Sequence, residues 1–252
     1  MRVVLFAGTR EGREISQHLA SLGANALISV ATPEGQAALG EIPLPVRVGR
    51  LDQAGILELL DSFQPDLVVD ATHPYAVQAS LNIAAAAREA GLEVIRPGRA
   101  ETPPGEANLV DTLEEAAAAV GERGNVLLAI GSQGLGAFRS CRDFPQRFYP
   151  RLLPTASALT AAQELGFPFA NIVAMQGPFS QALNHALMRQ LAIQELVTKD
   201  GGEEGGTPAK LAAARELGVR AILIRRPPGS GGITLAEVKN RLAKTGEEKL
   251  WK

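Results

Sequence analysis

A carboxylate, a hydroxyl, an imidazole and a phenol follow one another in the segment Asp70-Ala-Thr-His-Pro-Tyr-Ala76. The segment closes an apolar run, Leu67–Val69, of the kind that forms a strand buried on both faces of a parallel sheet. His73 could donate a hydrogen bond to a ligand, cap a helix that begins at Pro74, or carry a proton. The alternative interpretation is a structural turn in which Asp70 and Thr72 bond backbone groups.

Phe6-Ala-Gly-Thr-Arg-Glu-Gly12 follows the first apolar run and opens a helical pattern. Gly8 allows a tight turn, Thr9 can cap the helix, and the N–H groups at a helix start attract phosphate. The spacing departs from G-x-G-x-x-G because Phe6 stands at the first glycine, and Glu11 adds a negative charge. A nucleotide site and a plain strand–helix turn both remain open.

Glycine turns also follow predicted strands in the second half of the chain, at Gly131-Ser132-Gln133-Gly134, at Gly177–Ser180 and at Thr198-Lys199-Asp200-Gly201-Gly202. A lysine between glycines suits an anionic ligand, and a mobile charged loop is the alternative. Four arginines surround one predicted strand: Arg139, Arg142, Arg147 and Arg151. Such arginines form either a solvated face or a set of bidentate partners for carboxylates.

The composition does not indicate a disulfide, a metal site or a serine nucleophile. Cys141 is the single cysteine, so an internal disulfide is excluded, and no histidine pairing predicts a metal site. No G-x-S-x-G nucleophile motif occurs. The net charge of −2 predicts binding to neither nucleic acid nor a membrane surface. Without a signal-peptide pattern or a long apolar run, we expect a cytoplasmic protein.

Strand-like and helix-like segments alternate along the whole chain, which predicts an α/β protein with two Rossmann-like, doubly wound parallel-sheet domains and a cleft between them. The Pro- and Gly-rich stretch from Arg96 to Asn108 is the predicted linker. We therefore expect a dinucleotide-binding domain over residues 1–97 and a second domain over residues 98–252 that closes the substrate cleft. Ligands of such sheets bind at the carboxyl ends of the strands, where the polar segments lie.

Taken together, the motifs resemble precorrin-6A reductases over roughly residues 1–226. The resemblance is carried by Gly8–Gly12, Asp70–Ala76, Gly131–Leu135, Arg151–Pro154, Gln176–Ser180 and Thr198–Gly201. It implies a nicotinamide-dependent oxidoreductase that reduces one double bond of precorrin-6A or cobalt-precorrin-6A in cobalamin biosynthesis. It also implies a tetrapyrrole as substrate, and we expect a monomer or a weak homodimer.

The resemblance further implies roles for individual residues. Gly8, Thr9 and Arg10 would hold the pyrophosphate of the cofactor, and Thr72, His73 and Tyr75 would border the nicotinamide and the substrate. Ser132, Gln133, Lys199 and Arg151 would contact the substrate, with His73 and then Asp200 as candidate acids. Thr32, Arg47 and Arg50 would lie near the cofactor ribose. The cofactor is NADPH or NADH, and the absence of a basic residue directly after the second strand favours NADH.

Two alternatives remain on sequence grounds. The chain could be a nicotinamide-dependent reductase of another conjugated anionic substrate. It could also be a non-catalytic nucleotide-sensing module, in which the dinucleotide only sets the angle between two domains.

Overall fold

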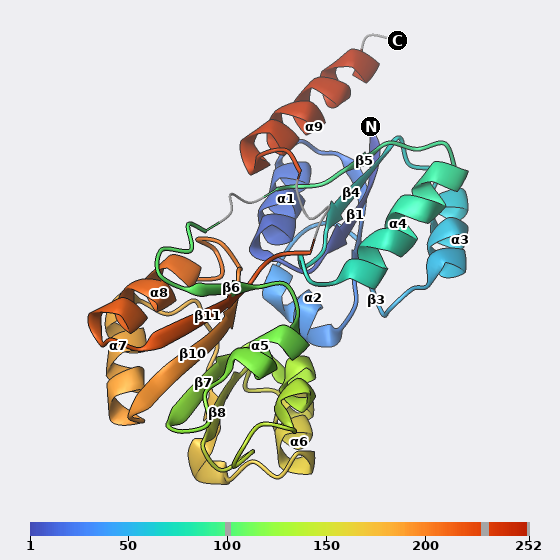
Figure 1. The fold of residues 1–252 in the computed structure, drawn as a ribbon. Helices are drawn as coiled ribbons and strands as arrows, with labels where there is room; N and C mark the ends of the chain where they lie inside the picture. Colours follow the sequence, from blue (N-terminus) through green and yellow to red (C-terminus); the bar gives the residue numbers. More distant parts are fainter. Residues whose placement is uncertain (99–101, 228–231, 251–252) are drawn as a thin grey trace. The chain divides into compact units, whose positions relative to one another are not determined.

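The computed structural model describes residues 1–98, 102–227 and 232–250, with side chains to residue 244. The chain forms two compact units, one of residues 1–99 and 227–252 and the other of residues 100–226. Each unit has its own parallel sheet with helices on both faces (Figure 1). Two parallel-sheet α/β domains were predicted, and this is confirmed.

The first unit contains a five-stranded sheet in the order β3-β2-β1-β4-β5. Its strands are β1 (Arg2–Ala7), β2 (Asn25–Val30), β3 (Val46–Val48), β4 (Leu67–Ala71) and β5 (Val94–Ile95). Its helices are α1 (Arg10–Ser21), α2 (Pro33–Leu39), α3 (Gln53–Phe63), α4 (Val77–Glu89) and α9 (Leu235–Leu250). The chain passes from β1 outward to β3 and then returns to β4, so the direction of winding reverses between β1 and β4.

Alternation of side chains along β1 explains why both faces of this sheet are covered. Val3 and Leu5 point to a core shared with α1, whereas Val4 and Phe6 point to a core shared with α3 and α4. Figure 1 shows α1 on one side of β1 and β4, with α3 and α4 on the other.

The second unit contains a six-stranded sheet in the order β6-β11-β10-β7-β8-β9. Its strands are β6 (Asn108–Val110), β7 (Asn125–Ala129), β8 (Phe148–Leu152), β9 (Val173–Ala174), β10 (Ile193–Lys199) and β11 (Arg220–Ile224). Its helices are α5 (Leu113–Ala119), α6 (Ala156–Glu164), α7 (Gln181–Gln190), α8 (Thr207–Glu216) and the 3-10 segments η1 (Ser132–Phe138) and η2 (Phe169–Asn171). Here the winding reverses between β7 and β10.

The C-terminal helix corrects the predicted domain boundary. Residues 98–252 were assigned to the second domain, but the chain after Pro227 belongs to the first unit. Val238 and Leu242 of α9 are fully buried in the core of that unit. His18 Nε2 of α1 also lies 3.1 Å from the carbonyl oxygen of Lys239. Burial of this apolar stripe against α1 fixes the helix there.

Two further expectations need adjustment. The helix expected to begin at Pro74 begins at Val77, because the backbone N–H of Ala76 donates to the carbonyl of His73 and forms a tight turn first. The predicted linker, residues 96–108, ends at the first residue of β6, and residues 99–101 within it lie outside the described part of the chain.

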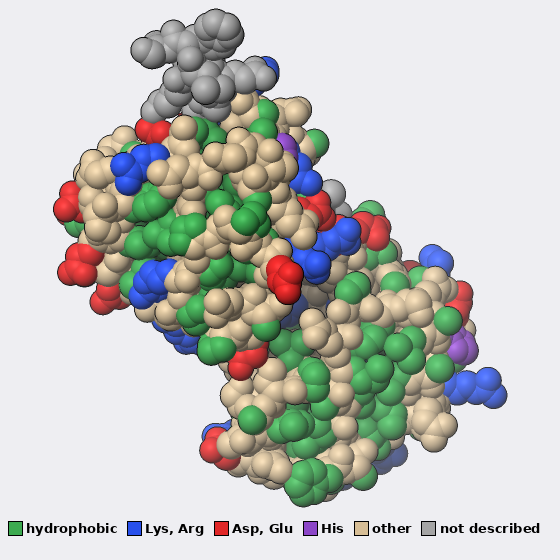
Figure 2. All heavy atoms as spheres, turned by 180° about the vertical axis from the view of Figure 1, so that it is seen from behind, with side chains coloured by type: hydrophobic (Ala, Val, Ile, Leu, Met, Phe, Trp, Pro, Cys, Tyr) green, Lys and Arg blue, Asp and Glu red, His purple; other side chains and the backbone are tan. Residues whose placement is uncertain are grey.

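Figure 2 shows acidic and basic side chains interspersed on one face of the molecule.

Candidate functional site

The carboxyl ends of β1 and β4 lie side by side where the winding of the first sheet reverses. Ala7 pairs with Ala71, so the loop that begins at Gly8 adjoins the loop that begins at Thr72. A Cβ atom added to Gly8 would lie 3.7 Å from the Cα of Thr72, which is ordinary contact distance. In doubly wound sheets this reversal opens the crevice in which nucleotides bind.

Thr9 connects the two loops and starts the first helix. Its hydroxyl donates to the carbonyl oxygen of Ala71 at 3.1 Å and accepts from the backbone N–H of Gly12 at 3.3 Å. Thr9 is therefore the N-cap of α1 and also fixes the first loop against the second. The N-terminus of α1, which is the positive end of the helix dipole, therefore lies at the edge of the sheet.

Gly12 has a packing role that the sequence analysis did not assign. A Cβ atom there would come within 3.0 Å of the Cβ and 3.1 Å of the Cα of Ala7. This close approach of helix to strand is the task of the last glycine in dinucleotide-binding turns. The spacing of the motif differs from G-x-G-x-x-G, but the physical requirement is the same.

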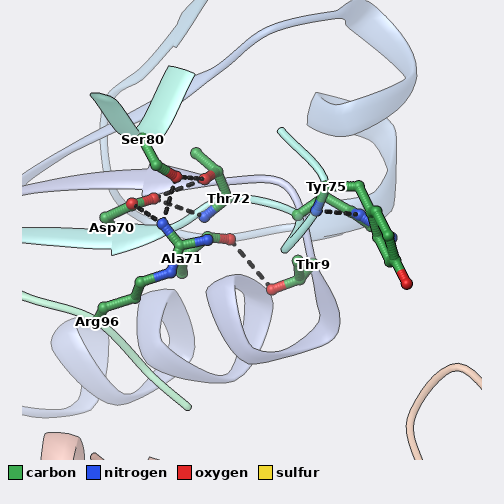
Figure 3. A network of polar contacts seen from close by, with 8 residues as sticks. Thr9, Asp70, Ala71, Thr72, Tyr75, Ser80 and Arg96 are labelled. Carbon is green, nitrogen blue, oxygen red and sulfur yellow. Dashed lines mark hydrogen bonds and ion pairs between the residues drawn. The ribbon is translucent and has the colours of Figure 1, made fainter. Parts of the chain in front are cut away.

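Asp70 and Thr72 belong to a half-buried polar network that fixes the second loop (Figure 3). The hydroxyl of Thr72 donates to Asp70 Oδ1 at 2.6 Å and lies 3.1 Å from the hydroxyl of Ser80. Arg96 forms an ion pair with Asp70 and also donates to Ser80. The sequence analysis did not identify Arg96 as the partner of Asp70. These contacts favour the structural interpretation of Asp70 and leave the role of Thr72 toward a ligand as a prediction.

His73 and Tyr75 stand on the outer side of the same turn. The backbone N–H of Tyr75 donates to His73 Nδ1 at 3.3 Å, and the two ring centroids are 5.8 Å apart. With Nδ1 as an acceptor, a neutral His73 carries its proton on Nε2. The imidazole is exposed and Tyr75 is half-buried, while Pro74 between them is buried. Figure 3 shows the Tyr75 ring directed away from the Asp70 network.

Three predicted cofactor residues gather at the carboxyl ends of β2 and β3. Thr32 caps α2 by accepting from Gly35 N–H at 3.2 Å. Arg47 pairs with Ser29 across the strands and donates to the carbonyl of Gly49 at 2.6 Å. The Gly49 N–H donates to the carbonyl of Val30, so the exposed Arg50 follows a turn beside the end of β2. Arg10, also predicted, lies on the exposed first turn of α1 and pairs with Glu14 at 3.2 Å.

In the second unit, the carboxyl ends of β7 and β10 are adjacent, since Ala129 pairs with Thr198. The loop after β7 turns through Gly131, whose φ of 80° favours glycine, and leads into Ser132 and Gln133 of η1. Lys199 is the last residue of β10, directly before the next loop; it is half-buried, and burial lowers the pKa of its ammonium. The sequence analysis grouped these three residues, and the sheet places their loops side by side.

Asp200 has contacts that favour a structural role over proton donation. Its carboxylate accepts from the Thr102 hydroxyl at 2.6 Å and from Gly202 N–H at 2.9 Å, and lies 3.1 Å from Arg226 Nε. Burial by itself raises the pKa of Asp200, but these hydrogen bonds and the charge of Arg226 outweigh it and hold the pKa below its usual range. A carboxyl held ionised in this way has no proton to give at neutral pH.

Of the four arginines that the sequence analysis grouped, Arg151 lies in the carboxyl half of β8. Its Nη1 donates to Asn184 Oδ1 at 2.7 Å, and its guanidinium lies 4.5 Å from the centre of the Phe179 ring. Arg147 instead precedes β8 and donates to backbone carbonyls. Arg142 pairs on the surface with Glu122. The tertiary structure therefore separates Arg151 from its sequence neighbours.

The described part of the chain contains no helix long and apolar enough to cross a membrane. Among the same residues, no group of three or more His, Cys, Asp or Glu side chains is arranged to hold a metal ion.

Comparison with known proteins agrees with this geometry. The family model described as Precorrin-6x reductase CbiJ/CobK matches residues 2–245. The Cobalt-precorrin-6A reductase of Methanothermobacter thermautotrophicus is 36% identical over 90% of this chain and 77% of its own. The Precorrin-6A reductase of Rhodococcus erythropolis is 35% identical over 90% of both chains.

A solved structure, CobK precorrin-6A reductase, shares the fold with a TM-score of 0.79 and 31% identity over 98% of both chains. Family model, relatives and structure agree over nearly the whole length of the chain. The chain therefore belongs to the precorrin-6x reductase family and is an oxidoreductase of cobalamin biosynthesis.

Proposed function

We propose that this chain reduces one double bond of cobalt-precorrin-6A with a reduced nicotinamide dinucleotide. The observation that supports the proposal most is the joined pair of loops at the reversal of the first sheet, where Thr9 bonds Ala71 at 3.1 Å. Cobalt-precorrin-6A reductases of Methanothermobacter thermautotrophicus and Priestia megaterium are among the similar proteins, which supports the cobalt form of the substrate.

The residues of the first unit fit a dinucleotide. Gly8 leaves the turn open, Thr9 orients the start of α1, and the N–H groups of a first helical turn suit a pyrophosphate. When bound, the nicotinamide supplies a hydride, and a proton completes the addition across the double bond. The dinucleotide is thereby oxidised and the macrocycle is reduced by two electrons.

We further propose NADPH as the preferred dinucleotide. On sequence alone NADH is favoured, because no basic residue follows the second strand directly. The register of β2 and β3 brings Arg47 beside Ser29, and the turn before Arg50 bonds the end of β2. Cationic side chains at this end of the second strand accommodate a 2′-phosphate.

His73 is the residue we propose to donate to the substrate. Its Nδ1 accepts from the N–H of Tyr75, which places the proton of the neutral imidazole on Nε2, the atom that would donate. Ser132, Gln133, Lys199 and Arg151 of the second unit are the proposed substrate contacts. The reacting macrocycle carries several carboxylates, for which a lysine and an arginine are suitable partners.

One anaerobic assay tests the proposal. The purified chain is mixed with cobalt-precorrin-6A or metal-free precorrin-6A, each with NADPH or NADH, and the loss of reduced-nicotinamide absorbance is followed beside the product mass. We expect fastest turnover with the cobalt form and NADPH, one dinucleotide per macrocycle, and a mass gain of two hydrogens. Oxidation that proceeds equally without a macrocycle, or in none of the four mixtures, would contradict the proposal.

A further inference from the structure

Lys210 is a buried cation that forms no ion pair with any described residue. It lies one turn into α8 and is 7% exposed. Within the described chain, no side chain or carbonyl accepts a hydrogen bond from its Nζ, and no carboxylate forms an ion pair with it. Every fully buried side-chain nitrogen or oxygen in the described chain has a partner, so the unpaired Nζ must reach the surface. The ammonium is therefore not completely enclosed by protein.

Arg151 is a second cation in the same neighbourhood, and it is half-buried. It has one neutral partner, Asn184, whose amide is held by the carbonyls of Phe179 and Ser180. No carboxylate of the described residues pairs with Arg151. Burial lowers the pKa of the Arg151 guanidinium to about 10, so it is charged at neutral pH.

The two cations are connected by the segment from Pro178 to Ser180. The guanidinium of Arg151 packs on the Phe179 ring at 4.5 Å. Gly206, which begins α8, would place a Cβ atom 3.6 Å from Pro178 and 3.7 Å from the Phe179 carbonyl oxygen. The backbone N–H of Lys210 donates to the carbonyl of Gly206. Thus one short segment packs against both Arg151 and the first turn of the Lys210 helix.

The charges around Lys210 leave an excess of positive charge. Its pKa falls to about 7, mainly because burial penalises the ammonium and further because Arg151 is positive, while Asp200 acts in the opposite direction. The carboxylate of Asp200, however, is already paired with Arg226 at 3.1 Å. Buried charges are costly unless a partner of opposite charge pairs with them, and no described residue forms an ion pair with Lys210.

We propose that Lys210 and Arg151 together bind one carboxylate of the tetrapyrrole, an inference that rests on the proposed function. Apolar side chains beside Arg151 support a macrocycle over a free phosphate. Leu153 and Met175, at the neighbouring ends of β8 and β9, are 56% and 44% exposed. Such an apolar border suits the face of a large conjugated ring. Lys210 is distinct from Lys199, the lysine that sequence reasoning favoured.

The test uses uroporphyrin, a stable tetrapyrrole octacarboxylate, with binding followed by fluorescence. Binding of a carboxylate requires the protonated ammonium, so wild-type affinity should fall about tenfold between pH 6 and pH 8 for a group that titrates near 7. Lys210→Met should bind at least about tenfold more weakly at pH 6, with little change up to pH 8. Arg215→Met removes a positive charge from the exposed end of the same helix and should behave as wild type.

Thermal unfolding gives a second readout. Because Lys210→Met removes a desolvated ammonium, its Tm without ligand should equal or exceed that of the wild type. Should this variant fail to fold, Arg151→Met decides. Removing the positive neighbour should move the midpoint of the pH-dependent binding to higher pH, since Arg151 lowers the pKa of Lys210.

Unchanged affinity and pH dependence in Lys210→Met would overturn the inference. Weaker NADPH binding with uroporphyrin binding intact would overturn it too, because the oxyanion would then be a dinucleotide phosphate. The proposed function fails separately. If the wild type binds uroporphyrin through Lys210 but oxidises no dinucleotide, the binding site is supported and the proposed activity is contradicted. If Lys210→Met turns over substrate as fast as the wild type, the activity is supported and the binding site is contradicted.

Discussion

The Nε atom of Arg226 lies 3.1 Å from Oδ2 of Asp200, and both side chains are more than nine-tenths buried. The same carboxylate accepts from the backbone N–H and the hydroxyl of Thr102. Thr102 is the first described residue of the second unit and Arg226 is its last residue. Asp200 therefore fixes both ends of this unit at the carboxyl end of β10.

Asp200→Asn should lower the free energy of unfolding by about 3–5 kcal/mol, because it removes the negative charge that pairs with the buried Arg226. Urea denaturation measures the effect. Asp111→Asn is the matched control, since Asp111 pairs with the neighbouring Arg225 at 3.6 Å on the exposed surface. That change should cost less than about 1 kcal/mol. Loss of turnover by a fully stable Asp200→Asn enzyme would restore Asp200 as a catalytic acid.

Acid should weaken the same contact. The pKa of Asp200 is lower in the folded protein than its usual 3.8, so its contribution to stability is present above that value. The contribution is lost as the pH falls through the lower, folded pKa. The stability difference between wild type and Asp200→Asn should consequently shrink as urea midpoints are measured at decreasing pH below 4. A constant difference down to the acid limit would show that the carboxylate is not the source.

Thr9→Ala should impair both the fold and dinucleotide binding. It removes the cap of α1 and the bond to Ala71, with an expected loss of about 1–2 kcal/mol and roughly tenfold weaker dinucleotide binding. Thr112→Ala removes an equivalent cap from α5 in the second unit, where Thr112 accepts from Glu115 N–H at 3.0 Å. It should lose similar stability with the dinucleotide Kd unchanged. Equal Kd values for both variants would exclude a binding role for the Thr9 loop.

Replacing Arg47 and Arg50 together by Gln should weaken NADPH binding by about 10- to 100-fold and leave NADH binding within about twofold. The reason is that only NADPH carries the 2′-phosphate that these cations would contact. Isothermal titration of each dinucleotide measures the two constants. Arg88→Gln with Arg241→Gln removes the same charge from α4 and α9 and should change neither. A parallel loss for NADH would point to a structural effect instead.

His73→Asn distinguishes a structural role of His73 in the turn from a role in catalysis. The Asn side-chain oxygen can accept from the Tyr75 N–H as Nδ1 does, but no group remains at the place of Nε2. We expect a wild-type Tm, near-normal dinucleotide binding and a kcat about 10²-fold lower or more. His185→Asn, on α7, should leave kcat as it is. If His73→Asn retains full kcat and its pH profile, His73 serves the turn alone.

Local pattern determined much of this protein. Apolar runs such as Val3–Ala7 and Leu67–Val69 specify buried strands, because only strands covered on both faces are apolar throughout. Gly8 and Thr9 after the first run predicted the loop and the start of α1, whereas the helix after the second run begins three residues later than predicted. The order of the motifs indicated the family, and the comparisons confirmed it.

Tertiary structure decided what local pattern leaves open. The stripe of Val238 and Leu242 fits any apolar face, and only packing on α1 assigns the helix to the first unit. Asp200 and Lys210 are ordinary charged residues in the sequence, and they lie 10 positions apart. The partner of Asp200 is Arg226, which is distant along the chain, whereas the equally distant Arg151 brings a like charge near Lys210. Pairing and burial of charge depend on contacts between residues that are distant in the sequence. Asp200 is therefore a structural residue, whereas Lys210 is a candidate binding group.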